Sequence, residues 1–182
     1  YNTSDPDYEA FHFTSYDNPH LPVDEIDKAK KELPEDRFAQ EYLADFRKQE
    51  GLVYKEFNRD IHLFDDFTHR PAIAEIIAGI DFGFTNPSVI LKIEHDTDNH
   101  YWVTNEWYKT GRTNAELIEV AKRMNINTFY PDPAEPDRIE EMRRAGLNVR
   151  EVSKDIEKGI DSVRELFKQN RLRIHKNCEN LI

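Results

Sequence analysis

Two aspartates, Asp81 and Asp132, each close an apolar run and stand beside glycine or proline. The runs read "IAGIDFGFTNPS" at 78–89 and "FYPDPAEP" at 129–136. An ionised carboxylate needs polar partners, and the end of an apolar strand offers few of them. We therefore expect the partner of these two carboxylates to come from outside the chain.

If the two strands are neighbours in a sheet, the carboxylates of Asp81 and Asp132 converge. Two anions at close range repel strongly in a low-dielectric setting, so a proton or a cation must join them. Mg²⁺ and Mn²⁺ take carboxylate and phosphate oxygens, and ion pairs about 3.5–4 Å apart serve phosphodiester cleavage. Gly83 would let a phosphate backbone approach, and Pro131 and Pro133 would stiffen the turn that aims Asp132. The alternative is structural, because a strand-end Asp often caps a loop.

Other residue types that often carry chemistry show no such pattern. The histidines lack metal-ligand spacing, and a single cysteine excludes both an internal disulfide and a multi-Cys zinc site. The two tryptophans and a tyrosine alternate around a predicted strand, which favours packing over base stacking. We expect packing or surface roles for His12, His62, His175, Cys178, Trp102, Trp107 and Tyr108.

Composition indicates a polar globular chain of one domain, or of one domain and a piece of another. The 182 residues are 38% hydrophobic and 34% charged. No apolar run is long enough for a membrane span, so we expect no membrane partner and a cytoplasmic location. The net charge of -11 argues against a protein that coats DNA through its overall field. Residues 138–182 nevertheless hold 11 basic and 8 acidic groups, so a basic face remains available there.

The first third of the chain reads as mainly helical. "FHFTS" at 11–15 predicts a strand before the turn at 17–19, and helices are expected at 23–33 and, after Pro34, at 35–50. Phe38, Tyr42 and Phe46 recur every four residues, and Gly51 stands where a helix C-terminal glycine belongs. A short strand is expected at 52–57, and a polar connector at 58–71.

From residue 72 onward, strands and helices alternate. Strands are predicted at 72–82, 88–96, 100–110, 126–132, 148–153 and 171–176. Helices are predicted from a capping box at Thr113 and Glu116, from Pro136 to Gly146, and at 154–170. Three antiparallel strands followed by alternating helices and strands indicate an α/β fold, a mixed sheet covered by helices on both faces and preceded by a mainly helical segment.

In three places the sequence resembles the large terminase subunit of tailed bacteriophages, the motor and nuclease that packages DNA. "FHFTSYDNPHLP" with "RFAQEYLADFRKQEGLVYKEF" is similar to the end of the family's ATPase domain. "GIDFGFTNPSV", and "YPDPAEP" followed by "KDIEKGIDSVRELF", are similar to its nuclease domain. The resemblance implies the end of an ATPase domain and a linker at 1–66, and a ribonuclease H-like nuclease domain at 67–182.

The resemblance also implies a function and a site. The chain would cut concatemeric double-stranded DNA by hydrolysis with two Mg²⁺ or Mn²⁺ ions, with Asp81 and Asp132 as metal-binding and catalytic residues. Lys158 in "EKGI", together with Lys154 and Arg138, would contact DNA. The implied partners are double-stranded DNA, the small terminase subunit and the portal protein, in the cytoplasm of the host bacterium.

Two departures from the family pattern indicate a fragment. The family's third acidic metal ligand is on a helix near its C-terminus, and nothing like that stretch precedes Ile182. The Gly-rich phosphate loop of the family's ATP site is also missing, so ATP would bind only elsewhere in the parent protein. We expect this chain to bind metal weakly and to cut DNA poorly.

Three other interpretations stay open. A transposase or integrase core would use Asp81, Asp132 and Glu165 as an acidic triad. A non-catalytic docking module of the packaging motor would need no metal. "GIDFGFTNPS" also resembles the first phosphate loop of the actin and heat-shock ATPase group, but the other glycine pairs that such a site needs are lacking.

Overall fold

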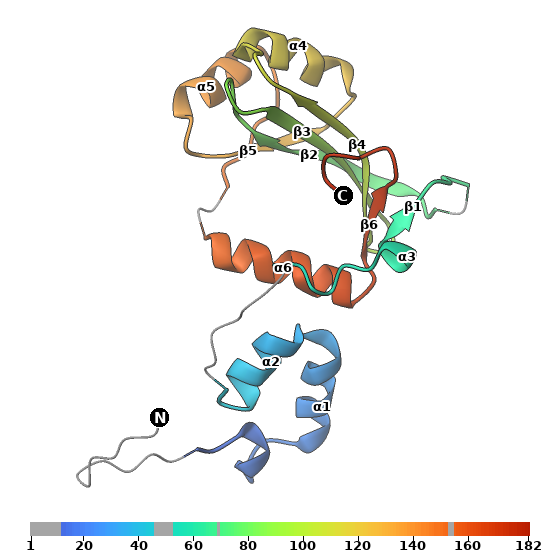
Figure 1. Cartoon of the computed structure of the whole chain (residues 1–182), viewed down its shortest axis with the longest axis vertical. Coiled ribbons are helices and arrows are strands. Elements are labelled where there is room, and N and C mark those ends of the chain that lie inside the picture. Colours follow the sequence, from blue (N-terminus) through green and yellow to red (C-terminus); the bar gives the residue numbers. More distant parts are fainter. Residues whose placement is uncertain (1–11, 46–52, 69, 153–154) are drawn as a thin grey trace, which may run out of the picture.

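The computed structural model of the chain describes residues 12–45, 53–68, 70–152 and 155–182. In this part of the chain a sheet lies between helices, with α4 (Asn114–Arg123) and α5 (Pro136–Arg144) on one face and α6 (Ile156–Lys168) on the other (Figure 1). Across the six-stranded sheet the order is β1 (Leu63–Phe64), β6 (Leu172–His175), β4 (Tyr101–Lys109), β3 (Ser88–Asp96), β2 (Ile73–Asp81) and β5 (Thr128–Pro131).

The sheet is mixed, as the order of elements predicts. Strands β2, β3 and β4 form an antiparallel meander. Strand β5 is parallel to β2, β6 is parallel to β4, and β1 is parallel to β6. Crossover helices connect the parallel strands and so cover both faces of the sheet, which confirms the predicted α/β class.

The turn between β3 and β4 is held by one buried side chain, Asp96. Its Oδ1 accepts hydrogen bonds from the backbone N–H groups of Asp98 (2.9 Å) and His100 (2.8 Å), and its Oδ2 accepts one from the indole of Trp102 (2.8 Å). Asn99 takes a positive φ of 66°, which the short polar side chain of asparagine tolerates. The predicted hairpin connection is confirmed.

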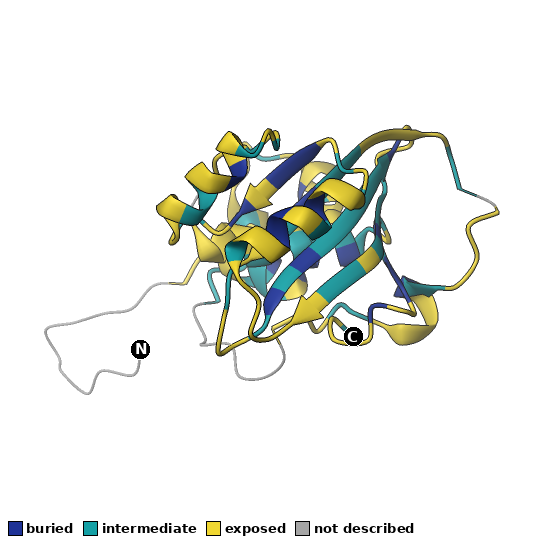
Figure 2. Ribbon diagram, turned by 90° about the horizontal axis from the view of Figure 1, so that it is seen from above, coloured by how far each residue is buried: buried dark blue, intermediate teal, exposed yellow. Residues whose placement is uncertain are grey.

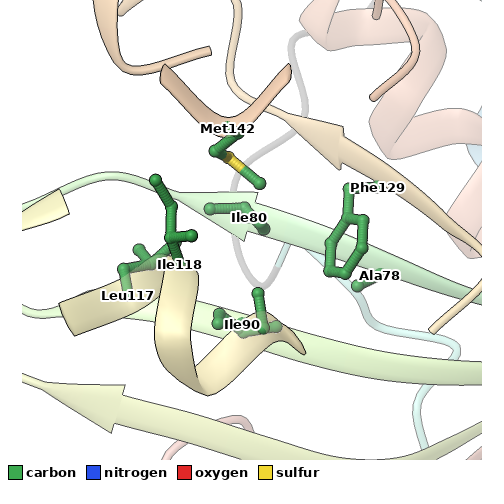
Figure 3. Packing of buried hydrophobic residues seen from close by; sticks show 8 residues of the cluster. Ala78, Ile80, Ile90, Leu117, Ile118, Phe129 and Met142 are labelled. Atoms are coloured by element: carbon green, nitrogen blue, oxygen red, sulfur yellow. The ribbon is translucent and has the colours of Figure 1, made fainter. Parts of the chain in front are cut away.

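The first core fills the space between the sheet and helices α4 and α5 (Figure 3). Its buried members are Ala78, Ile80, Ile90, Leu117, Ile118, Ala121, Phe129 and Met142. Each large apolar side chain buried here contributes about 1.5–3 kcal/mol. The capping box predicted for α4 is present, with the Thr113 N–H 2.9 Å from the Glu116 carboxylate. Trp107 packs against this core, as predicted.

The second core lies on the opposite face, under α6. Its buried members are Val103, Phe167, Leu172, Ile174 and Cys178. An apolar cavity of about 590 Å³ remains between α6 and the sheet. His62 and His175 are buried and pack against the rings of Phe167 and Phe67, respectively, which confirms their predicted packing role. Burial, with a smaller contribution from the charge of Glu106, raises the pKa of the Cys178 thiol to about 11, which disfavours the reactive thiolate.

Exposure follows the layers. In Figure 2 the outer surfaces of the helices are exposed, whereas much of the sheet between them is buried or half-buried. Strand β2 departs from the prediction of a strand buried on both faces, because Ile73, Ala74 and Glu75 are exposed and only Ala78 and Ile80 are buried. The exposed residues at the start of β2 belong to neither of the two cores, whereas Ala78 and Ile80 belong to the first.

The segment before the sheet is mainly helical, as predicted, but its details differ. It holds the short 3-10 helix η1 (Ser15–Asp17), α1 (Val23–Glu32) and α2 (Glu35–Tyr42). The strand predicted at 11–15 is wrong for the described residues from 12 on, since Thr14 caps η1 instead. Among the helices of the described ranges, none has the length and hydropathy needed to cross a bilayer.

Helix α2 ends well before the predicted Gly51. Ala44 has a positive φ of 52°, and the Asp45 N–H bonds the Ala39 carbonyl at 2.9 Å, so the chain leaves the helix through a left-handed residue. Phe46 and Gly51 lie outside the described residues.

Two predicted strands do not form, and two short elements were not predicted. Residues 53–56 form a turn instead of a strand. Residues 148–152 contribute one isolated bridge, between Val149 and Phe129. The connector at 58–71 contains α3 (Arg59–His62) and β1, whose pairing with β6 carries the sheet beyond its predicted elements.

The helical segment is joined to α6 by a buried cation. The Arg164 side chain is 3% exposed and pairs with Asp36 of α2. It also donates two hydrogen bonds to the Glu56 carboxylate, at 2.9 and 3.1 Å. Burial opposes ionisation of Asp36, but the hydrogen bond and charge of Arg164 outweigh it, so the pKa of Asp36 is lowered. A more exposed pair, Arg37 with Asp161 at 3.4 Å, crosses the same contact.

Candidate metal centre

The two predicted aspartates come together at one edge of the sheet. Strands β2 and β5 are parallel neighbours, with Ile80 opposite Pro131. The Asp132 N–H bonds the Ile80 carbonyl at 2.9 Å, so the ladder continues one residue further. Asp81 and Asp132 are therefore the next residues of two adjacent strands at the same end. The neighbour relation on which the prediction depended is confirmed.

Both carboxylates belong to the α6 face of the sheet. Ile80 and Pro131 are buried on the face of α4 and α5, and successive residues of a strand point to opposite faces. Asp81 and Asp132 are both exposed. An ion at this edge could therefore be reached from solvent.

The loop after Asp81 is closed by the Ser88 side chain and by close packing of its own backbone around Gly83. The Ser88 hydroxyl donates to the Gly83 carbonyl at 2.6 Å and accepts from the Gly83 N–H at 3.1 Å. A Cβ on Gly83 would lie 2.4 Å from the Asn86 carbonyl oxygen and 2.5 Å from that of Pro87. This corrects the expected reason for the glycine: the turn itself fills the space that was assigned to an approaching phosphate.

The loop after Asp132 is stiffened in a different way. Asp132 Oδ1 accepts a hydrogen bond from the Ala134 N–H at 2.9 Å, which orients the carboxylate and leaves Oδ2 free for a cation. Pro136 then starts α5 at its first position, as predicted, and Gly146 follows the helix with a φ of 87°. The Asp132 side chain thus caps its loop, and this structural role still leaves one carboxylate oxygen without a hydrogen bond.

The donor set fits a hard divalent cation, but it is incomplete. Within the described residues, the Asp81 carboxylate has no hydrogen-bond partner, and no Lys or Arg forms an ion pair with either aspartate. No group of three or more Asp, Glu, His or Cys side chains that could hold a metal occurs in the described ranges. Glu165 bonds Gln169 at 2.9 Å, so the acidic triad of the transposase alternative does not assemble there.

The three predicted DNA contacts differ in their surroundings. Lys154 lies outside the described residues. Lys158 is in the first turn of α6, with its side chain 85% exposed and its Nζ 3.3 Å from the Asp155 carboxylate. Arg138 is in the first turn of α5 and is 28% exposed.

Which residues hold the loops that carry Asp81 and Asp132 was not predicted from the sequence. Ser88 comes directly after the Thr-Asn-Pro turn, and a hydroxyl at a loop end is a usable signal because Ser and Thr often bond nearby backbone. The hydrogen bond from Arg138 to Gly83 joins segments that are distant in sequence, and no local pattern indicates it.

No profile of a known protein family matches the sequence. The chain is 26% identical over 189 residues to the large terminase subunit of Escherichia phage T5, a match that covers 97% of this chain and 43% of that protein. The chain thus spans less than half the length of this curated relative.

Two solved structures share the fold. The large terminase of a thermophilic bacteriophage superposes with a TM-score of 0.81 at 18% identity, over 93% of this chain and 44% of that one. The nuclease domain of the P22 large terminase superposes with a TM-score of 0.62 at 16% identity, over 72% of this chain and 75% of that one. The chain is thus similar in sequence and fold to bacteriophage large terminase subunits, and its mixed sheet has the ribonuclease H-like α/β fold of their nuclease domains.

Proposed function

We propose that the chain contains the nuclease domain of a DNA-packaging terminase, which cuts concatemeric double-stranded DNA. The observation that carries this proposal is the placement of Asp81 and Asp132 at adjacent ends of β2 and β5, in a fold shared with terminase nucleases. The proposed division is an ATPase-domain end and linker at 1–66 and the nuclease domain at 67–182. Because β1 (Leu63–Phe64) pairs with β6, the sheet itself begins a few residues before this proposed boundary.

Asp81 and Asp132 would hold Mg²⁺ or Mn²⁺. Such ions supply acidification of an attacking water and stabilisation of the negative charge that develops on the leaving oxygen. The protein's part is to keep two anions together at an edge that solvent and phosphate can reach. Asp81 offers both oxygens, whereas Asp132 offers the one that Ala134 does not engage. A third acidic ligand would complete the site.

The substrate is recognised through its charge. Lys158 extends from the first turn of α6 and, with Lys154, would contact phosphates; phosphate contacts position DNA without reading its sequence. The contact predicted for Arg138 remains part of this proposal. Because the chain carries a net charge of -11 and offers few candidate phosphate contacts, we expect weak binding of DNA with a modest salt dependence.

The parent protein would act in the host cytoplasm together with the small terminase subunit and the portal protein. The ATP site that drives packaging would belong to the part of the parent that precedes this chain. The curated relative is more than twice as long as the matched region, which leaves room for such a domain.

The test is a titration with MnCl₂ followed by calorimetry and by thermal unfolding. We expect Asp81→Asn and Asp132→Asn to lower Mn²⁺ affinity on the order of 100-fold, which corresponds to about 2.7 kcal/mol, because each variant removes a charged ligand. The matched control is Asp98→Asn, an exposed aspartate in the β3–β4 turn at the opposite end of the sheet.

Nicking of supercoiled plasmid with Mn²⁺ present then tests catalysis. Metal binding that depends on both aspartates, with nicking lost in both variants, supports the nuclease. Equal Mn²⁺ affinity in wild type and both variants would refute the metal site and favour the non-catalytic docking module.

A further inference from the structure

We propose that Arg138 is a positioning residue that fixes the spacing of the Asp81 and Asp132 carboxylates by holding their two loops together. The inference rests on the proposed metal site and assigns Arg138 a role beyond the predicted DNA contact. It comes from the place of this side chain, which leaves α5 in its first turn and reaches the loop that follows β2.

Arg138 contacts both loops. Its Nη1 donates to the Gly83 carbonyl at 3.3 Å, and its guanidinium lies 5.6 Å from the centre of the Phe82 ring; both residues closely follow Asp81. Its Nε lies 3.6 Å from the carboxylate of Glu135, which closely follows Asp132. One side chain therefore bridges the two segments that carry the candidate ligands.

The other contacts of these loops act mainly within each loop. Ser88 bonds Gly83, and the Ala134 N–H bonds Asp132. The last backbone bond between the strands is that from Asp132 to Ile80, before the loops begin. Beyond it, among the residues that the structure describes, the side-chain hydrogen bond and the cation–π contact that cross from the 82–87 loop to the 133–138 segment are those of Arg138.

The charge of Arg138 is directed away from the metal ligands. Its ion pair is with Glu135, and neither Asp81 nor Asp132 forms an ion pair with any described Lys or Arg. An arginine paired with either aspartate would compete with a cation for it. As placed, Arg138 supports the loops and leaves both carboxylates available.

A lysine cannot replace this bridge. The guanidinium is planar, so it can place Nη1 for its hydrogen bond to the Gly83 carbonyl while Nε faces the Glu135 carboxylate, its ion-pair partner at 3.6 Å. A lysine ammonium is a single point of charge on a flexible stem, so it would keep the charge while losing the defined geometry. This difference separates positioning from simple electrostatics.

The experiment compares Arg138→Gln and Arg138→Lys with wild type and with Arg144→Gln, all in the 182-residue chain. Arg144 is on the same helix, and its side chain is 79% exposed and paired with Glu140, so its variant matches the change of charge without touching either loop. Mn²⁺ binding is measured by calorimetry and by the EPR spectrum of bound Mn²⁺. Thermal unfolding without metal controls for folding.

We expect Arg138→Gln to weaken Mn²⁺ binding about 10-fold or more, as for other residues that orient metal ligands from the second layer. Arg138→Lys should also weaken it, and in both variants the EPR spectrum of bound Mn²⁺ should change. Arg144→Gln should bind like wild type. A role in global stability alone would lower the melting temperature without changing the EPR spectrum of the bound ion.

The two proposals can fail separately. If Asp81→Asn loses Mn²⁺ binding while both Arg138 variants bind like wild type, the positioning role is wrong and the metal site stands. Wild-type affinity in Arg138→Lys alone would also overturn the role, because charge without geometry would then suffice. If Arg138→Gln does not fold, Arg138→Lys decides the matter by the same criterion. If Asp81→Asn itself binds like wild type, the proposed function has failed.

Discussion

Replacing Arg164 with alanine should disrupt the contact between the helical segment and α6 more than any exposed charge change. The guanidinium is 3% exposed and neutralises two carboxylates that are themselves about nine-tenths buried, those of Asp36 and Glu56. Arg164→Ala removes the shared cation from both carboxylates in a poorly solvated setting and leaves Asp36 only the more exposed Lys55, whose Nζ lies 3.6 Å away.

The magnitude follows from these contacts. Removing one partner of a buried ion pair costs about 3–5 kcal/mol, because the remaining charge keeps its desolvation penalty. For a chain of this length, 1 kcal/mol shifts the melting temperature by roughly 2–4 °C. We therefore expect a decrease of roughly 6–20 °C. Arg37→Ala crosses the same contact, but its side chain is 42% exposed, so its cost should stay below about 1 kcal/mol.

The assay is thermal unfolding followed by circular dichroism, with urea unfolding as a second measure. A triple variant, Arg164→Met with Asp36→Asn and Glu56→Gln, should regain more than half of the loss, because no buried charge remains unpaired. A melting temperature of Arg164→Ala equal to that of Arg37→Ala would refute the reasoning. The network would then be solvated in solution and contribute little.

Three further predictions concern the site loop, acid stability and the cysteine. Gly83→Ala should destabilise the chain by about 1–3 kcal/mol and weaken Mn²⁺ binding, because the added Cβ would clash with two backbone carbonyls. The control is Gly159→Ala in α6, where nothing lies within 4 Å of the added Cβ, so this variant should be neutral or stabilising. Equal melting temperatures for the two variants would contradict this account. Burial opposes ionisation of Asp96, but the hydrogen bonds that its carboxylate accepts outweigh burial and lower its pKa below the ordinary value of 3.8. The ionised carboxylate therefore stabilises the fold fully above about pH 3.8, and this stabilisation is lost as the pH falls through the lowered pKa of the folded chain. Melting temperatures measured from about pH 5 to about pH 2 should therefore fall less in Asp96→Asn than in wild type, and parallel curves would argue against this linkage. Cys178, with its pKa raised to about 11, should react slowly with iodoacetamide in the native chain and rapidly in urea; equal rates would show that the thiol is accessible.

Local patterns predicted the elements that position the site. Alternating and continuous apolar runs marked β2, β3 and β4, and the Thr113 capping box and Pro136 marked the starts of α4 and α5. Each of these signals depends only on residues that are close together in the sequence, so the element can be predicted without knowledge of tertiary contacts. The strand order was not predicted: the convergence of Asp81 and Asp132 was conditional on two neighbouring strands, and the structure supplies that condition by pairing β5 with β2.

Elements without a local signal were missed or misassigned. Strand β1 has two residues and exists because β6 pairs with it. Residues 53–56 have the apolar and aromatic types of a strand but form a turn, with Phe57 packed against the core under α6. Helix α2 ends at a left-handed Ala44, a residue type that favours helices and carries no stop signal.

The sequence by itself determined the mixed sheet, the helices that cover it and the two strand-end carboxylates, because hydrophobic periodicity and turn chemistry act over short distances. Only the tertiary structure decided what surrounds these carboxylates and how the helical segment contacts α6. Arg138 and Arg164 look like surface charges in the sequence, yet one bridges the two ligand loops and the other is buried between two anions. Their partners are distant along the chain or on other elements, and such contacts are settled by three-dimensional packing, where a buried charge persists only beside its counter-charge.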